Sequence, residues 1–370
     1  MPAEAPAAPA ADPQFFAQGI PVEVGKIQRE LKKLWQDSHE MAMRASRLNL
    51  VIFSTAEHSL RANTALVEAV ARQHALRALL IASKPQTNET RVRAWVNAHC
   101  QISKSGQKQR CSEQIAIQLE GEARTGGLVP NLVFSNLDSD LPLYFWRQGH
   151  FSNSPSEQLM AWVDCLIYDS ADWPQPGAQF AIVKKLARDA DLENGLADLN
   201  WTRMSSLRAA VAQFFDAPDA LKALSEMESV ELVHRANPGS RTRALLFVGW
   251  LASQLGWRPN GLNDAGDAPR FRTAAGRKLA IHLHEGGTGE ADTRRVTLRT
   301  AGGSEFTISR DEGSDFFSTC AHYGSGGEQR QLLPVGAEDL ASLVSAELVH
   351  GGGHKTYLRA LAAVEEVWQD

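Results

Sequence analysis

The chain has 370 residues, 43% of them hydrophobic and 22% charged, and its formal net charge at pH 7 is −5. This length is enough for two domains with a sizeable core, and the acidic balance argues against a nucleic-acid-binding protein that relies on phosphate contacts. No apolar run approaches the ~20 residues of a membrane span. The Ala- and Pro-rich start lacks the basic and apolar segments of a signal or transit peptide, so we expect a cytoplasmic protein with no membrane partner.

The first part of the chain predicts an α/β domain that follows a disordered tail at residues 1–20. Apolar residues at helical spacing predict an amphipathic helix over 24–35. Two short apolar runs, 48–53 and 78–82, flank a helical pattern at 60–72. This arrangement is typical of a β-α-β unit, in which the two strands are parallel.

An antiparallel hairpin follows, because residues 91–102 and 111–119 both alternate between apolar and polar side chains around a polar turn. The alternation predicts one solvated face for the hairpin, which would extend one edge of the sheet. Cys100 and Cys111 flank the turn and could face each other. In a cytosolic chain we expect them to be reduced thiols.

A second β-α-β unit is predicted from strands at 141–146 and 165–168 and a helix at 154–163. Both strands are apolar without interruption, as in a parallel sheet that is covered on both faces. Trp146 and Arg147 leave the C-terminal end of the first strand. Open α/β sheets place their binding residues at these ends, so the pair is a candidate contact surface.

A polar break after residue 215 predicts a domain boundary, with an N-terminal α/β domain at 21–220 and a C-terminal α+β domain at 225–370. The N-terminal domain would have a mostly parallel sheet with flanking helices and the antiparallel hairpin. The C-terminal domain would hold an antiparallel meander closed by two helices. Its predicted elements are a strand at 229–234, a helix at 240–255, strands at 279–284, 295–300, 305–308 and 315–320, and helices at 338–348 and 355–367.

Arg235, Arg241 and Arg243 cluster around the start of the helix that Ser240 is predicted to cap. Cations at this end oppose the helix dipole. An acid of this chain, an acid of a partner or a phosphate would each offset that cost, and a solvated helix start would need no ligand. Since Arg241 and Arg243 are two residues apart, they cannot share one helix face.

The remaining candidates carry weaker signals. Gly351, Gly352 and Gly353 precede a helix and could approach a phosphate, but they also serve as a plain connector between helices. His282 and His284 share a strand face without a third metal ligand placed by the sequence. No nucleophile, zinc or nucleotide motif is found, so we expect no cofactor, and the chain is either a divergent enzyme or not an enzyme.

Five segments, taken in order, resemble the glucose-6-phosphate dehydrogenase assembly protein OpcA family. They are residues 21–35, 47–53, 111–117, the Asp-Leu-Pro-Leu-Tyr-Phe-Trp-Arg run at 140–147, and Leu-Phe-Val-Gly-Trp-Leu-Ala-Ser-Gln-Leu-Gly-Trp at 246–257. The resemblance covers nearly the whole chain after the first twenty residues. It implies a two-domain, non-catalytic protein that binds glucose-6-phosphate dehydrogenase, promotes its active oligomer and supports NADPH production in the oxidative pentose phosphate pathway.

With this partner, the predicted contact residues are Trp146, Arg147, Arg235, Arg241 and Arg243. Two alternatives remain open. A sugar-phosphate-binding enzyme or sensor would use the arginines and the Gly351 loop to hold phosphate, and a structural homo-oligomer would use the exposed surface for self-association.

Overall fold

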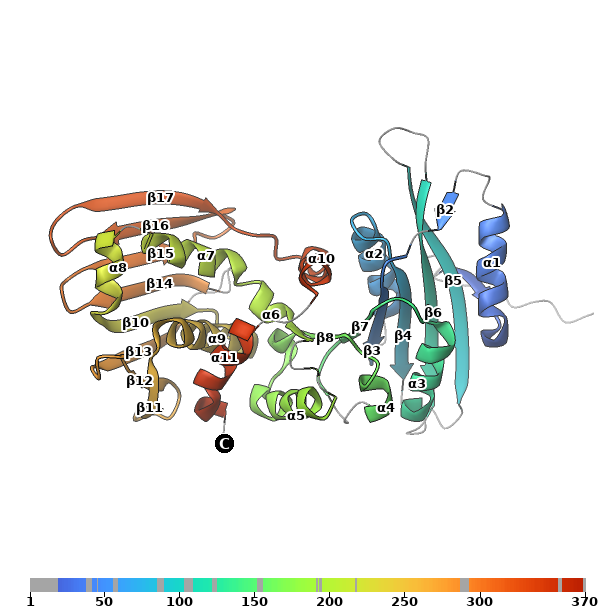
Figure 1. The fold of residues 1–370 in the computed structure, drawn as a ribbon, viewed down its shortest axis with the longest axis horizontal. Coiled ribbons are helices and arrows are strands. Elements are labelled where there is room, and N and C mark those ends of the chain that lie inside the picture. The colour runs from blue at the N-terminus through green and yellow to red at the C-terminus, as the bar shows by residue number, and fades with distance from the viewer. Residues whose placement is uncertain are drawn as a thin grey trace, which may run out of the picture. The chain divides into compact units, whose positions relative to one another are not determined.

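The computed structural model describes residues 19–37, 42–44, 46–55, 59–84, 90–102, 109–121, 125–151, 156–190, 192, 195–216, 218–286, 293–351 and 355–368. The chain divides into two compact units (Figure 1). Unit 1 comprises Met1–Gln148 and Gln158–Asp164, and unit 2 comprises Gly149–Glu157 and Cys165–Asp370. The predicted boundary at 220–225 would separate two segments that fold independently. This boundary stays a prediction. The predicted tail lies outside the described residues except for its last two positions.

Unit 1 is built on a sheet with strand order β1-β5-β6-β4-β3-β7, and β2 pairs with β6. The strands are β1 Ile20–Val22, β2 Ala42–Arg44, β3 Asn49–Ser54, β4 Arg77–Lys84, β5 Arg91–Ile102, β6 Gln109–Glu120 and β7 Leu143–Arg147. β6, β4, β3 and β7 are parallel neighbours, while β5 pairs antiparallel with β6 and β1 antiparallel with β5. The first β-α-β unit and the hairpin beside it are therefore confirmed.

The centre of this sheet is buried on both faces. Leu50, Val51 and Ile52 follow one another on β3 and are each 0% exposed, although consecutive strand residues point to opposite faces. Three helices pack on the sheet: α1 Ile27–Asp37 on β5, and both α2 Ser59–Ala71 and α3 Thr125–Asn136 on β4 and β6. The short 3-10 helix η2, Val24–Lys26, precedes α1.

The predicted solvated face of the hairpin is wrong for β6. Glu113 and Gln114 are 2% and 0% exposed. Gln114 Nε2 donates to Thr64 Oγ1 on α2 at 3.1 Å, and Glu113 forms an ion pair with Arg77 at 3.1 Å. The alternation of polar and apolar residues predicted that these side chains face solvent. The sequence could not show that they have hydrogen-bond and ion-pair partners inside the fold.

The second predicted β-α-β unit keeps its strands and loses most of its helix. β7 and β8, Cys165–Tyr168, are buried throughout. The helix α4 covers only Glu157–Met160, against the predicted 154–163, and the first two predicted positions, 154 and 155, lie outside the described residues.

Unit 2 begins with β8 and β9, Leu196–Asp198, which pair in parallel and are connected through η3 Ser170–Asp172 and α5 Pro176–Asp189. Asp198 ends β9 and caps α6, Leu199–Thr202, by accepting a hydrogen bond from Asn200 N at 3.0 Å. Two more helices follow, α7 Ser205–Phe214 and α8 Pro218–Leu224.

An eight-stranded sheet forms the largest part of unit 2, with order β11-β12-β13-β10-β14-β15-β16-β17. The strands are β10 Met227–His234, β11 Arg258–Leu262, β12 Pro269–Arg272, β13 Lys278–Glu285, β14 Thr293–Thr300, β15 Glu305–Ser309, β16 Phe316–His322 and β17 Glu328–Pro334. β10 and β13 are parallel, and the other neighbours are antiparallel. The predicted antiparallel meander is confirmed, and β11, β12 and β17 are additions that the sequence analysis missed.

The remaining helices of unit 2 are α9 Pro238–Leu255, α10 Leu340–His350, α11 Lys355–Ala363 and the 3-10 helix η4 Glu365–Trp368. The cap of α9 is Asn237 and not Ser240, since Asn237 Oδ1 accepts from Ser240 N at 2.7 Å. Gly256 ends α9 in the left-handed conformation that favours glycine. A Cβ at Gly249 would lie 2.1 Å from the Ala360 carbonyl oxygen, so this glycine permits the close packing of α9 and α11.

Candidate functional site

Trp146 and Arg147 lie at the end of β7 and are buried, with 2% and 6% exposure. The Arg147 guanidinium lies 4.8 Å from the centre of the Phe53 ring, and Nη1 donates to the Gln148 carbonyl oxygen at 2.5 Å. Burial lowers the pKa of Arg147 to about 10. The pair thus packs within its own chain, and its predicted contact with a partner stays a prediction.

The three predicted arginines around α9 do not converge. Arg235 is exposed, and Arg241 is partly exposed with Nη2 donating to the Asp267 carbonyl oxygen at 2.7 Å. Arg243 is 5% exposed, and its Nε donates to Asn200 Oδ1 at 2.8 Å. The two-residue spacing separates Arg241 from Arg243, as predicted, so only Arg235 and Arg241 offer solvent-accessible cationic groups.

Arg243 belongs to a buried polar network that the sequence analysis did not find. Its hub is Asp198, which is 0% exposed and whose Oδ1 accepts hydrogen bonds from Ser170 N and Asn200 N, both at 3.0 Å. Asn200 Nδ2 donates in turn to Ser170 Oγ and to the Gly239 carbonyl oxygen, each at 3.1 Å. The network therefore ties η3 and α6 to the first turn of α9.

The other carboxylate oxygen of Asp198 faces two buried tyrosines. Tyr357 Oη donates to Asp198 Oδ2 at 3.3 Å and lies 2.8 Å from Tyr168 Oη. Burial, with a smaller contribution from the charge of Asp169, raises the pKa of the Asp198 carboxyl to about 7. A carboxyl that is sealed from solvent and fully hydrogen-bonded is suited to joining elements, and less suited to exchanging protons with a substrate.

Two further polar contacts surround this network. Asp169 accepts two hydrogen bonds from the Arg203 guanidinium, at 2.7 and 2.6 Å. Thr202 donates to Glu347, a carboxylate of α10 that is 0% exposed. Sequence spacing could not reveal these partners because residues 168, 198, 243 and 357 meet only in the folded chain. The one signal available in the sequence was that an acid, Asp169, directly follows the apolar run at 165–168.

A cleft of about 680 Å³ opens in unit 2 where the first turns of α5 and α9 meet the end of η4. Its lining includes Gly177, Asn237, Arg241, Glu285 and Trp368. Two helix N-termini and one arginine favour an anion, whereas Glu285 opposes one. The cleft lining does not include Gly351, which ends α10 in the left-handed conformation, and Gly352 and Gly353 lie outside the described residues.

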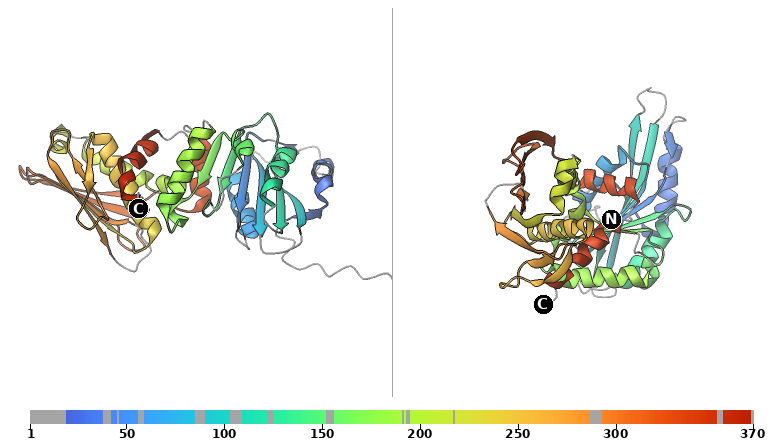
Figure 2. Two further views of the ribbon diagram at one scale, coloured as in Figure 1. Left: turned by 90° about the horizontal axis from the view of Figure 1, so that it is seen from below. Right: turned by 60° about the vertical axis from the view of Figure 1, so that its left-hand side comes forward.

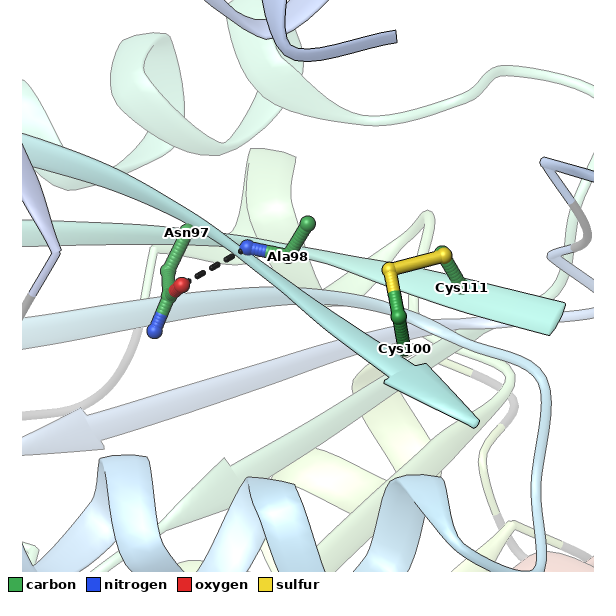
Figure 3. Close-up of a disulfide and its surroundings, with 4 residues drawn as sticks. All are labelled: Asn97, Ala98, Cys100 and Cys111. Atoms are coloured by element: carbon green, nitrogen blue, oxygen red, sulfur yellow. Dashed lines mark hydrogen bonds between the residues drawn. A yellow bond between two sulfur atoms is a disulfide. The ribbon is translucent and has the colours of Figure 1, made fainter. Parts of the chain in front are cut away.

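Cys100 and Cys111 form a disulfide, which corrects the predicted reduced thiols (Figure 3). The register of the hairpin places them directly opposite each other, with their Cα atoms 4.0 Å apart. Such cross-strand neighbours need little backbone movement to bond. Cys165 and Cys320 take no part in this disulfide, and the first is buried and the second partly exposed.

The predicted His282 and His284 do share a strand face, with ring centres 6.3 Å apart. Among the described residues, no group of three or more His, Cys, Asp or Glu side chains could hold a metal ion. The helices in the described ranges include none that is both long enough and apolar enough to span a membrane.

Two family models match consecutive parts of the chain. The model for the N-terminal domain of a glucose-6-phosphate dehydrogenase subunit matches residues 67–185, and the model for the C-terminal domain of the same kind of subunit matches residues 194–361. The chain belongs to the OpcA family. This confirms the resemblance that the five sequence segments indicated.

Proteins named as OxPP cycle protein OpcA are similar to this OpcA-family chain. The protein of Nostoc punctiforme is 34% identical over 49% of this chain and 38% of its own length. The proteins of Synechococcus elongatus and Synechocystis sp. are 27% and 26% identical, over 74% and 64% of this chain and 63% and 49% of their own lengths. The matches thus span between about two fifths and three fifths of these curated relatives.

Solved structures show a more distant similarity. A glucose-6-phosphate dehydrogenase in complex with glucose-6-phosphate aligns over 89% of this chain and 91% of its own, with 9% identity and a TM-score of 0.45. An oxidoreductase domain protein from Kribbella flavida aligns over 86% and 95%, with 9% identity and a TM-score of 0.43. Similarity at this level assigns no activity to the chain.

Proposed function

We propose that this OpcA-family protein binds glucose-6-phosphate dehydrogenase without catalysing a reaction itself, and that it promotes the active oligomer of that enzyme. The observation that carries the proposal is the pair of family models, both named for a glucose-6-phosphate dehydrogenase subunit, which together follow the chain from residue 67 to residue 361. The product of the activated enzyme would be NADPH for the oxidative pentose phosphate pathway.

The physical mechanism is differential binding. A protein that binds the active conformation of the dehydrogenase more tightly than the inactive one shifts the population toward the active form by the difference in binding free energy. A tenfold preference corresponds to about 1.4 kcal/mol, and an almost complete switch from 1:99 to 99:1 needs a preference of roughly 10⁴-fold. Contacts that form only with the assembled, active enzyme would supply this preference.

The buried network around Asp198 supports a binding role over a catalytic one. Asp198, whose pKa burial raises to about 7, is 0% exposed, and the described hydrogen-bond donors to its carboxylate, Ser170, Asn200 and Tyr357, lie in the same unit. The carboxylate oxygens of Asp198 therefore have structural partners, and Asp198 does not line the cleft at Arg241. A general acid or base has to reach its substrate.

Dehydrogenase turnover, measured with and without this protein over a range of glucose 6-phosphate concentrations, tests the proposal. We expect a lower apparent KM or a higher kcat that saturates as protein is added. A matched control is the same titration with heat-unfolded protein. Unchanged kinetics with the dehydrogenase of the same cell, at protein concentrations well above those of the enzyme, would refute the activator role.

The second candidate function is sugar-phosphate binding, which the cleft at Arg241 favours. A ligand that binds only the folded state raises the melting temperature in proportion to the logarithm of its concentration. Glucose 6-phosphate and 6-phosphogluconate should therefore raise Tm for the natural protein, and Arg241→Ala should remove the shift. A Tm that is constant up to millimolar ligand would exclude this candidate.

A further inference from the structure

The eight-stranded sheet of unit 2 has one face that no described helix of the same unit covers. Helix α9 contacts β10, α7 contacts β15 and β16, and Figure 2 shows the helices of this unit on one side of the sheet. Residues on the covered side, such as Val230, Leu298 and Ile308, are at most 2% exposed. The opposite side, which we call the bare face, carries the alternate residues Glu231, Arg299, Thr307, Ser318 and Leu332.

The bare face has an apolar corner. Phe316 on β16 and Leu332 on β17 are 49% and 69% exposed. The register pairs Phe316 with Pro334 and Ser318 with Leu332, so Phe316 and Leu332 are diagonal neighbours on the same side of the sheet. Two large apolar side chains that remain exposed next to each other form a small apolar patch, which is a candidate contact point.

The strand that carries Leu332 is also the edge of the sheet. β17 pairs with β16 alone among the described strands. Its outward backbone N–H and C=O groups can therefore pair with an extended segment of another chain. The edge and the apolar corner adjoin, so one partner could use both.

The middle of the bare face is polar and carries charges of both signs. Arg299 Nη1 lies 2.9 Å from Glu231 Oε2, and Arg299 Nε lies 2.8 Å from Glu305 Oε2. Exposed ion pairs of this kind add little to stability. A surface that combines one apolar contact with a polar surround is typical of partners that associate without being permanently joined.

The size of the bare face suits a protein partner. Strands β13, β10, β14, β15, β16 and β17 are successive neighbours. At ~4.8 Å per strand and ~3.3 Å per residue, their surface spans roughly 600 Å² in projection. A standard interface buries about 800 Å² of accessible surface on each partner, and side chains raise the accessible area above the projected one.

We propose that the bare face, with Phe316 and Leu332 as its apolar contact, is the surface that binds glucose-6-phosphate dehydrogenase. This inference rests on the proposed function. Two observations select this occupant: all eight strands lie within residues 194–361, the segment matched by the family model named for a dehydrogenase subunit, and the face is more polar than a permanent contact between two copies of one chain would be.

The test compares two leucines that are exposed to a similar extent. Leu332→Glu places a charge in the apolar corner, and Leu221→Glu makes the same change on α8, where the leucine is 57% exposed. Affinity for the purified dehydrogenase of the same organism is measured by biolayer interferometry, with Tm as the check on folding. Leu332→Glu should weaken binding at least tenfold at unchanged Tm, and Leu221→Glu should change it less than twofold. If Leu332→Glu lowers Tm, Ser318→Arg makes the same test from a neighbouring strand.

Each other outcome overturns the inference. If the natural protein binds and both variants bind equally well, the partner uses another surface, while the proposed function stands. If the natural protein does not bind the dehydrogenase, both the proposed function and this inference fail. If sedimentation shows that Leu332→Glu dissociates an oligomer of this protein alone, a second copy of the chain covers the bare face.

Discussion

The two sheets of this molecule differ in what covers them. In unit 1, β3 and β4 are buried on both faces and read as unbroken apolar runs, Leu-Val-Ile-Phe and Ala-Leu-Leu-Ile-Ala. In unit 2, β14 and β15 alternate, with apolar residues under the helices and polar ones on the bare face. β3 and β4 thus bury nearly all their side chains in the core, whereas β14 and β15 leave about half of theirs on the bare face.

The largest expected effect tests the core of unit 1. Ile52→Ala should lower the free energy of unfolding by about 2–5 kcal/mol, because the side chain is fully buried and its removal leaves a cavity. Ser318→Ala on the bare face should change it by less than about 0.5 kcal/mol. Urea unfolding followed by circular dichroism measures both. Equal losses of unfolding free energy in the two variants would mean that the bare face contributes to stability as much as the core of unit 1 does.

The second effect concerns the buried network of unit 2. Because burial raises the pKa of Asp198 to about 7 in the folded state, folding favours the protonated form. Its contribution is fully present below about pH 4 and is lost as the pH rises to about 7, by up to about 4 kcal/mol. Asp198→Asn imitates the protonated carboxyl, so its stability advantage over the natural protein should grow across this range. Parallel pH profiles from urea unfolding would contradict this assignment.

The third effect comes from the disulfide that staples the hairpin of unit 1. Reduction should lower the free energy of unfolding by about 2–4 kcal/mol, since the bond between Cys100 and Cys111 restricts the unfolded chain. Urea unfolding with and without dithiothreitol measures the change. The double variant Cys100→Ser, Cys111→Ser is the control and should not respond to the reductant. If dithiothreitol lowers the unfolding free energy of the double variant by the same amount, the loss does not come from this disulfide.

The smallest expected effect is on the bare face. Arg299→Ala removes two exposed ion pairs, to Glu231 and Glu305, and should cost no more than about 1 kcal/mol, less at high salt. Thermal unfolding at two ionic strengths measures it. A loss of unfolding free energy above about 2 kcal/mol would mean that these ion pairs mainly stabilise the sheet, and that this part of the bare face is not mainly a contact surface.

Much of the fold follows from local pattern. Continuous apolar runs predicted β3, β4 and β7, and alternation predicted the strands of the meander, because side-chain direction reports directly on burial. The pattern failed where polar side chains are satisfied internally, as for Glu113 and Gln114 on β6. It also missed β17, whose seven residues are almost all exposed and show no apolar face.

The sites were harder to predict than the fold. The sequence placed Trp146 and Arg147 at a strand end but could not show that both pack inside the chain. It grouped three arginines because they are close in sequence, but Arg235 precedes α9 and is exposed, whereas Arg243 lies on α9 and is buried. Asp198, Tyr168 and Tyr357 come together from distant segments, and the apolar corner depends on a strand register that no single segment encodes.

Hydrogen–deuterium exchange of the full chain, with and without saturating glucose-6-phosphate dehydrogenase, tests whether the bare face binds the enzyme. We expect slower exchange in β16 and β17 when the enzyme is present, since the edge strand and its neighbour become covered. Exchange in β3 and β4, already protected in the core of unit 1, should not change. Protection confined to unit 1, with β16 and β17 unaltered, would contradict the claim that the bare face is the docking surface.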